Sequence, residues 1–187
     1  MSRGRRSGFG RIVAAAGAVL LTALAVPVPA FADETFWEMN NFTEVNSAPY
    51  SRMFDMQNFS GGYQFSTPAG YRCRMQWLTS ATEAARGECW GALPGTSDNW
   101  VHMSSGEEAV FGNTDVARFD EHPDGQGGNK PFTAADYPLL PAGSKISRKS
   151  VQITCAVRDV LTACITDAVG NRPRHGFALQ PSGNVLF

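Results

Sequence analysis

The sequence predicts an all-β fold: a compact antiparallel sandwich or barrel-like sheet with two disulfide-stapled hairpins and an irregular N-terminal arm. From residue 61 onward, short runs of β-branched and aromatic residues alternate with turns rich in Gly, Pro, Ser and Asn, as is typical of strands. No run in this region keeps the 3.6-residue apolar period of a helix over three turns. The four cysteines fall in the strand-like runs, where disulfides can join neighbouring strands. We therefore expect a single β-rich domain at 61–187.

Residues 1–32 have the pattern of a secretory signal peptide. A basic stretch is followed by an apolar run at 12–26, which is too short to span a bilayer. Ala30 and Ala32 then give the spacing of small residues that signal peptidase reads. We expect cleavage after Ala32, export of the protein, and no transmembrane segment in the remaining chain. The alternative is an N-terminal membrane anchor that stays uncleaved.

Residues 33–60 form the expected N-terminal arm or linker. They are dense in large apolar side chains but follow neither the helical nor the strand period. Two interpretations are open: the arm packs on the domain, or it is a partner-binding segment, because exposed aromatic clusters mark interaction surfaces. The second interpretation makes Trp37, Phe42, Tyr50 and Phe54 candidate binding residues.

The expected strands follow one another along the chain, each bounded by turn residues. A short helix is expected at 133–137, within a long loop at 120–143 that is rich in Gly and Pro. The strands are expected at 63–66, 71–78, 86–91, 100–103, 108–111, 116–119 and 145–148, then in a hairpin at 151–166, and finally at 176–179 and 184–187.

The cysteines indicate two disulfides, because their number is even and the chain is expected to be exported. Three connectivities are possible. Sequence order favours the local one, in which Cys73 pairs with Cys89 and Cys155 with Cys164, since each pair is bracketed by runs that can form a hairpin. A zinc site would need closely spaced cysteine pairs, whereas here 15 and 8 residues separate them, so no metal and no cofactor is expected.

The register of the second hairpin can be tested for consistency. If Cys155 lies opposite Cys164, then Ile153 faces Thr166 across the ribbon. Apolar and β-branched residues then share one side, as a half-buried antiparallel pair requires.

The first hairpin gives a similar result when its cysteines are placed opposite each other. Arg74 then faces Glu88, and Arg72 faces Trp90, on the side away from the cysteines. An ion pair and a cation–π contact are therefore expected on one face of this hairpin.

The richest polar cluster lies in the long loop, at Asp120, Glu121, His122 and Asp124. Closely spaced oxygens before Gly125 could hold calcium, but the spacing of an EF-hand loop is not met. A solvated acidic loop is the default interpretation.

Three histidines, His102, His122 and His175, are the candidates for acid–base chemistry. None has the spacing of a metalloenzyme motif, and no nucleophile motif of the G-x-S-x-G type occurs. His175 follows Arg172 and Arg174, which suggests an acid or base beside an anionic ligand held by the two arginines; the alternative is a histidine at a strand entry that hydrogen-bonds within the sheet. We therefore assign no catalytic residue and keep Arg174 and His175 as candidate binding residues.

The charge of the exported part argues against a polyanionic partner. Removing residues 1–32 takes away four of the 16 basic residues and none of the 17 acidic ones, which leaves a net charge of −5. A nucleic-acid-binding protein needs clustered Lys and Arg. Only Lys145, Arg148 and Lys149 lie close together, and a solvated strand face explains them.

Taken in order, the cysteines and two short Gly-containing motifs resemble a family of small secreted proteins from mycobacteria and related actinobacteria, over residues 65–187. The family pattern is F-x-S-P-S-G-N-I-x-C, a second C, then C and G-V-x-C, then G-H-G-F-x-L. This chain departs from it, with Tyr71-Arg72 for N-I, Leu161-Thr162 for G-V, and Arg174 for Gly. The resemblance implies export and two local disulfides, and it supplies no catalytic residues. The matching residues are Phe65-Ser-Thr-Pro-Ala-Gly70 with Cys73, then Cys89, Cys155 and Cys164, and His175-Gly-Phe-Ala-Leu179.

These observations lead to an expectation about function. The protein is expected to be a secreted or cell-envelope-associated, non-catalytic β-domain that binds a protein or an envelope component. One alternative is a secreted hydrolase that uses His175 or His102 with carboxylates of the 120–124 loop. The other is a small inhibitor of an extracellular enzyme.

Overall fold

The computed structural model describes residues 39–55, 60–78, 85–124, 126–168 and 173–187. All of them belong to the compact unit formed by Phe31–Phe187. The expected signal peptide and Trp37 lie outside the described residues. Regular structure in these ranges consists of strands and short 3₁₀ turns, which confirms the all-β class. None of the helical turns described is long and apolar enough to cross a bilayer.

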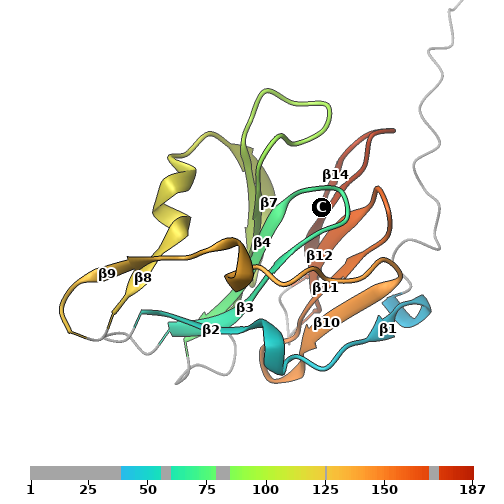
Figure 1. Cartoon of the computed structure of the whole chain (residues 1–187). Helices are drawn as coiled ribbons and strands as arrows, with labels where there is room; N and C mark the ends of the chain where they lie inside the picture. Colours follow the sequence, from blue (N-terminus) through green and yellow to red (C-terminus); the bar gives the residue numbers. More distant parts are fainter. Residues whose placement is uncertain (1–38, 56–59, 79–84, 125, 169–172) are drawn as a thin grey trace, which may run out of the picture. The chain divides into compact units, whose positions relative to one another are not determined.

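The first sheet, here called the meander sheet, follows the chain from one strand to the next (Figure 1). Its strands lie in the order β2-β3-β4-β5-β6-β7, and each pairs antiparallel with its neighbour. Short turns suffice for such connections, because consecutive antiparallel strands need no crossover. The strands are β2 (Ser51–Asp55), β3 (Ser60–Ser66), β4 (Arg72–Leu78), β5 (Ala85–Trp90), β6 (Trp100–Ser104) and β7 (Glu107–Gly112).

The second sheet, the C-terminal sheet, has the order β1-β10-β11-β12-β13-β14. Its pairs are antiparallel except at one edge, where the two-residue β1 lies parallel to β10, a hundred residues later in the chain. The strands are β1 (Thr43–Glu44), β10 (Ser144–Arg148), β11 (Ile153–Val157), β12 (Thr162–Thr166), β13 (His175–Leu179) and β14 (Val185–Leu186).

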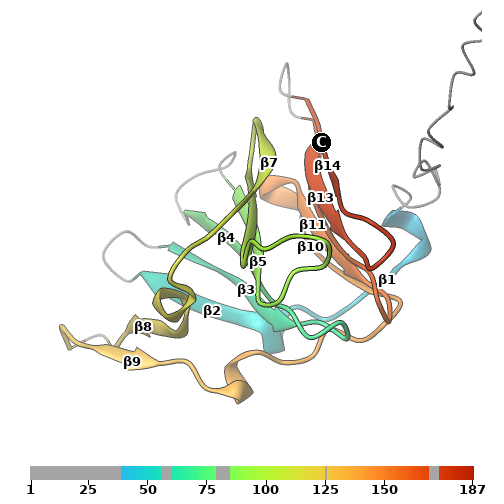
Figure 2. The same ribbon diagram turned by 90° about the horizontal axis from the view of Figure 1, so that it is seen from above.

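The two sheets pack face to face and share one hydrophobic core. Strand β13 contacts β6 and β7, and β5 contacts both β11 and β12. Figure 2 shows the green strands of the meander sheet and the orange and red strands of the C-terminal sheet as two layers. The arrangement is therefore the sandwich rather than the closed barrel.

Both disulfides are those expected, Cys73–Cys89 and Cys155–Cys164. All four cysteines are fully buried and belong to the same core, one disulfide from each sheet. The predicted registers are also confirmed, because Ile153 pairs with Thr166. Likewise, in the register of β4 and β5, Arg74 lies opposite Glu88, and Arg72 lies opposite Trp90.

Residues 113–124 and 126–137 fold back across the outer face of the meander sheet, the face away from the core. A small ribbon of β8 (Glu121–Pro123) and β9 (Asn129–Pro131) projects here (Figures 1 and 2). The expected strand at 116–119 is wrong: it is a 3₁₀ turn, η4 (Val116–Asp120), because the Asp115 carboxylate caps it by accepting a hydrogen bond from the Ala117 amide. The expected helix at 133–137 is one 3₁₀ turn, η5 (Ala134–Asp136), with a capping box between Thr133 and Asp136.

The N-terminal segment contributes strands to both sheets, which corrects the expectation of an aromatic binding surface there. Phe42 is only 4 % exposed and Tyr50 only 7 %, so neither is available to a partner. Phe42 packs on Ala156, Ala163 and Ala178, the small residues on the outer side of the C-terminal sheet.

Tyr50 and Phe54 have equally local partners. Tyr50 belongs to the main core, and its hydroxyl donates to the Leu139 carbonyl. Phe54 is half-buried and meets the Phe132 ring edge-on. These residues therefore anchor the segment to the domain and form no exposed aromatic patch.

Truncating Phe42 tests this assignment. We expect Phe42→Ala to lower the free energy of unfolding by about 3 to 5 kcal/mol, as for other buried Phe side chains. Met53→Ala, a control in the same segment at a position that is 41 % exposed, should cost less than about 1 kcal/mol. Urea unfolding of both variants measures the two losses; a small loss at Phe42 would mean that the segment does not pack on the sheet.

Candidate functional site

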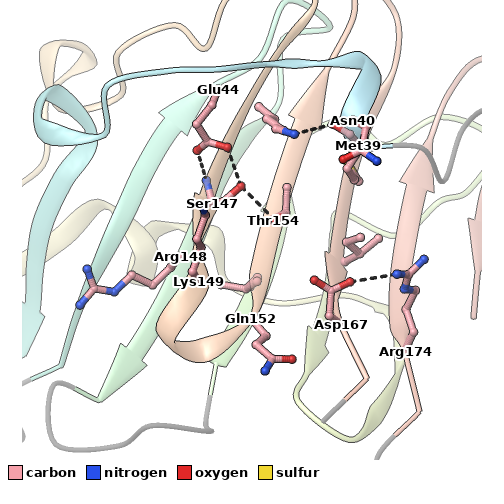
Figure 3. A pocket seen from close by; sticks show the side chains of 13 residues that line it. Met39, Asn40, Glu44, Ser147, Arg148, Lys149, Gln152, Thr154, Asp167 and Arg174 are labelled. Atoms are coloured by element: carbon pink, nitrogen blue, oxygen red, sulfur yellow. Dashed lines mark hydrogen bonds and ion pairs between the residues drawn. The ribbon is translucent and has the colours of Figure 1, made fainter.

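A pocket of about 620 Å³ opens on the outer face of the C-terminal sheet (Figure 3). Its volume lies in the range of small-molecule sites. The N-terminal residues Met39, Asn40 and Glu44 meet there with lining residues from 145–174, about a hundred residues later in the chain. The lining residues are Met39, Asn40, Glu44, Lys145, Ser147, Arg148, Lys149, Gln152, Ile153, Thr154, Ile165, Asp167 and Arg174.

The floor of the pocket is a row of three cross-strand neighbours. Ser147 pairs with Thr154, and Thr154 pairs with Ile165, across β10, β11 and β12. Side chains alternate between the two faces of a strand, and Cys155 faces the core, so Thr154 faces outward. The buried disulfide of this sheet therefore places the floor residues on the solvent side.

One wall is held in place by hydrogen bonds from the floor to the N-terminal segment. The Glu44 carboxylate accepts from the Ser147 backbone N–H and from the Ser147 hydroxyl, both at 2.8 Å. Thr154 donates to the same hydroxyl at 3.1 Å. The Lys145 ammonium donates to the Met39 carbonyl at 2.7 Å, at the start of the turn η2 (Met39–Asn41). These bonds fix the pocket before any ligand binds.

The opposite wall carries an ion pair. The Arg174 guanidinium lies 3.0 Å from the Asp167 carboxylate, and both side chains are about half exposed. The Asp167 backbone N–H donates to the Gln152 carbonyl, which ties this wall to the rim. Gln152 has φ 53° and ψ 44°, a left-handed conformation that is costly for a residue with a Cβ. Its backbone is thus held in place by the surrounding turn η6 (Lys149–Val151) and by Asp167.

Several polar side chains of the pocket keep their hydrogen-bonding capacity. Asn40, Lys149 and Gln152 make no side-chain hydrogen bond or ion pair with any described residue. Arg148 extends away from the other labelled side chains in Figure 3, and its guanidinium lies 5.2 Å from the centre of the Trp77 ring. The groups left for a ligand are two amides and a primary ammonium.

The structure separates the predicted pair Arg174 and His175. Arg174 lines the pocket, whereas His175 lies on the core side of β13, on the same side as Phe177. Its Nδ1 is buried without a hydrogen-bond partner. Since neighbouring residues of a strand face opposite ways, the two side chains cannot act on one ligand.

The three histidines do not converge. His102 lies in the meander sheet, stacked on Trp100 with ring centres 3.9 Å apart. His122 stacks on Phe132 beside the β8–β9 ribbon, and His175 is in the other sheet. The geometry therefore gives the hydrolase alternative no pair of imidazoles.

The loop carboxylates are occupied by the protein itself. Asp120 accepts from Arg72 at 2.8 Å and from the Tyr137 hydroxyl at 2.8 Å. Asp124 accepts from the backbone of Gln126 and Gly128, and these bonds lower the pKa of its carboxyl. In the part of the chain that the structure describes, no group of three His, Cys, Asp or Glu is arranged to hold a metal ion.

The sequence placed Arg74 opposite Glu88 but did not reveal that both lie in a buried polar row on the outer face of the meander sheet. The expected ion pair between these two side chains is not among the ion pairs of the described residues. Gln64, Arg74, Glu88 and His102 are direct neighbours across β3, β4, β5 and β6. The Arg74 guanidinium donates to the Gln64 amide oxygen and to the Phe119 carbonyl, and the Trp100 indole N–H donates to Glu88. Only 6 % of Arg74 and 1 % of Glu88 is exposed.

An aromatic cluster on residues 90–137 covers this row and contacts its cation. The guanidinium of Arg74 lies 4.1 Å from the centre of the Phe54 ring and 5.5 Å from that of Trp90. The expected contact of Arg72 with Trp90 does not form; Arg72 instead pairs with Asp120 and lies over Tyr137. The cluster consists of Trp90, Phe119, Phe132 and Tyr137, with Phe54 and Trp100 packed against it.

Burial governs the ionisation of this row. It raises the pKa of the Glu88 carboxyl, an effect that the charges of Arg74 and Arg86 oppose. Burial likewise lowers the pKa of the Arg74 guanidinium, although Glu88 beside it acts in the other direction. Burial and the hydrogen bond to Asp120 raise the pKa of Tyr137. A buried carboxyl with a raised pKa resembles a catalytic acid, but Glu88 is out of reach of a substrate.

The raised pKa of Glu88 predicts a pH dependence of stability. The folded state takes up a proton at a pH where the unfolded state, with a pKa near 4.5, does not, so folding is favoured as the pH falls toward that value. The wild type should therefore gain stability relative to Glu88→Gln as the pH falls from neutrality toward 4.5. Denaturant unfolding of both proteins across this range is the measurement. If the free energies of unfolding of the two proteins change in parallel with pH, burial does not perturb the pKa of the Glu88 carboxyl.

No protein-family model matches the chain, and neither a curated protein nor a solved structure is similar to it.

Proposed function

We propose that the protein is a secreted or cell-envelope-associated, non-catalytic β-domain that binds a protein or an envelope component through the pocket on the C-terminal sheet. The observation that carries this proposal is the pre-formed pocket, whose walls are fixed by Glu44, Ser147, Lys145 and the Asp167–Arg174 pair. Side chains that are already ordered lose little entropy when a ligand binds.

Export is supported by the covalent framework together with the N-terminal sequence. Two disulfides that join neighbouring strands persist in an oxidising compartment, and they are rare in the cytosol of mesophiles. The expected signal peptide at 1–32 and the resemblance to small secreted actinobacterial proteins point the same way.

A binding role agrees better with the geometry than a hydrolytic one. Hydrolysis needs an acid and a base within hydrogen-bond reach of the same substrate atom. The candidate imidazoles lie in three different sheets, and Asp120 and Asp124 are hydrogen-bonded within the protein. The described residues that line the pocket include no histidine, cysteine or buried carboxylate.

Filling the pocket tests the proposal. Thr154→Tyr places a large side chain on the floor of the pocket, and Val110→Tyr places the same side chain on the exposed outer face of the meander sheet as a control. We expect immobilised wild type and the control to retain the same component from a cell-envelope extract, and the pocket variant to lose it by tenfold or more. Mass spectrometry of the eluates gives the readout.

Thermal unfolding of both variants checks that each remains folded. Equal retention of that component by the pocket variant would contradict the proposed site. Failure of the wild type to retain any component would contradict a binding role in the envelope.

A further inference from the structure

We infer that the pocket on the C-terminal sheet binds an anionic saccharide, a hydroxyl-rich molecule that carries a carboxylate or phosphate group. The inference rests on the proposed function, because it takes this pocket as the ligand site. Charge, hydrogen-bonding capacity and the position of the pocket in the sheet each support it.

The pocket is basic although the exported part of the chain is acidic. Among the described residues, Lys145, Lys149 and Arg174 present basic groups to it and Glu44 and Asp167 acidic ones, while Arg148 extends away toward Trp77. The part of the chain outside the signal peptide has, by contrast, a net charge of −5. The sequence alone assigned Lys145, Arg148 and Lys149 to a solvated face, and the fold adds Arg174, which directly precedes β13. A local excess of positive charge in a hollow attracts anions.

Both carboxylates of the pocket are already engaged, so they offer little to a cationic ligand. Glu44 is bound by two donors of Ser147, and Asp167 by the guanidinium of Arg174. By contrast, the Lys145 ammonium donates to a single carbonyl among the described residues, that of Met39, and Lys149 has no side-chain partner among them. The groups that remain favour an acceptor with negative charge.

The uncharged groups suit a hydroxyl-rich ligand. The amides of Asn40 and Gln152 each offer both donors and acceptors, as a sugar hydroxyl requires, and neither is used within the described chain. Figure 3 shows Gln152 at one end of the pocket and Asn40 at the other. The Ile165 side chain on the floor can contact the C–H face of a ring.

The position of the pocket argues against an acidic peptide or a nucleic acid. A peptide that adds a strand needs a free sheet edge, whereas β10, β11 and β12 are paired with one another beneath the pocket. Single-stranded nucleic acid needs aromatic side chains for base stacking, and none of the described residues that line this pocket is aromatic. A saccharide uses only the side chains that the face of the sheet presents.

The test uses the protein secreted by an exporting host, with its disulfides formed, and titration calorimetry. The probes are a tetragalacturonate, a glycerol-phosphate tetramer, neutral maltotetraose and a hexaglutamate peptide. We expect one or both of the first two to bind at least about tenfold more tightly than the last two. Comparison of tetragalacturonate, which carries carboxylates, with the glycerol-phosphate tetramer identifies which anion the pocket accepts. Binding of either probe supports the inference.

Three substitutions locate the binding. Lys149→Gln and Arg174→Gln should each weaken binding of the acidic saccharide by about tenfold or more, because each removes a charged donor. Lys130→Gln, which removes an exposed charge from β9 outside the pocket, should leave binding unchanged. Thermal unfolding confirms that all three variants fold.

The outcomes separate this inference from the proposed function. If Thr154→Tyr abolishes capture of an envelope component while no acidic saccharide binds the wild type, the ligand class is wrong and the binding role stands. Binding of maltotetraose or hexaglutamate as tight as that of the acidic saccharides also overturns the ligand class. Acidic saccharide binding that survives Lys149→Gln, Arg174→Gln and Thr154→Tyr overturns the site.

Discussion

The constraint on which the rest of the structure depends is the burial of both disulfides in the core shared by the two sheets. Cys73 and Cys89 belong to the central hairpin of the meander sheet, and Cys155 and Cys164 to that of the C-terminal sheet. Because side chains alternate along a strand, an inward cysteine assigns every other residue of its strand to a face. A shift of the strand register by one residue would place Thr154 in the core and Ile153 on the solvent side. Each bridge also closes a short loop, which stabilises the fold by about 2.5 to 3 kcal/mol in the loop-entropy model.

The two outer faces have different coverings, and this difference leaves one of them open to a ligand. Residues 113–137 fold over the meander sheet and bury Arg74 and Glu88 under aromatic rings. On the C-terminal sheet, Phe42 covers the small residues at one end, and the polar pocket lies beside it. On the first face Gln64, Arg74 and Glu88 are thus enclosed and hydrogen-bonded within the protein, whereas several polar side chains on the second make no side-chain hydrogen bond with the described residues. We place binding on the second face for this reason.

The sequence predicts those features that depend on neighbouring strands. The fold class, both disulfides and the registers of the two cysteine hairpins follow from alternation and turn residues, and the structure confirms them. The role of Phe42 depends instead on a contact with β11, β12 and β13, more than a hundred residues later. The pocket likewise joins residues 39–44 to strands a hundred residues later, so the sequence singled out Lys145, Arg148, Lys149 and Arg174 without assigning them to one site. Glu88 is buried because a later loop folds back over the outer face of the meander sheet. The local periodicity of the sequence does not reveal such a long-range contact.

The disulfide connectivity is tested most directly by peptide mapping of the secreted protein with its disulfides left unreduced. Proteolysis between the cysteines, followed by mass spectrometry, identifies which cysteine-containing peptides are joined. The account predicts two joined pairs, Cys73 with Cys89 and Cys155 with Cys164, and no free thiol. Peptides joined between the two hairpins, or alkylated cysteines in the folded protein, would contradict it, because the faces of both sheets would then no longer be fixed as described.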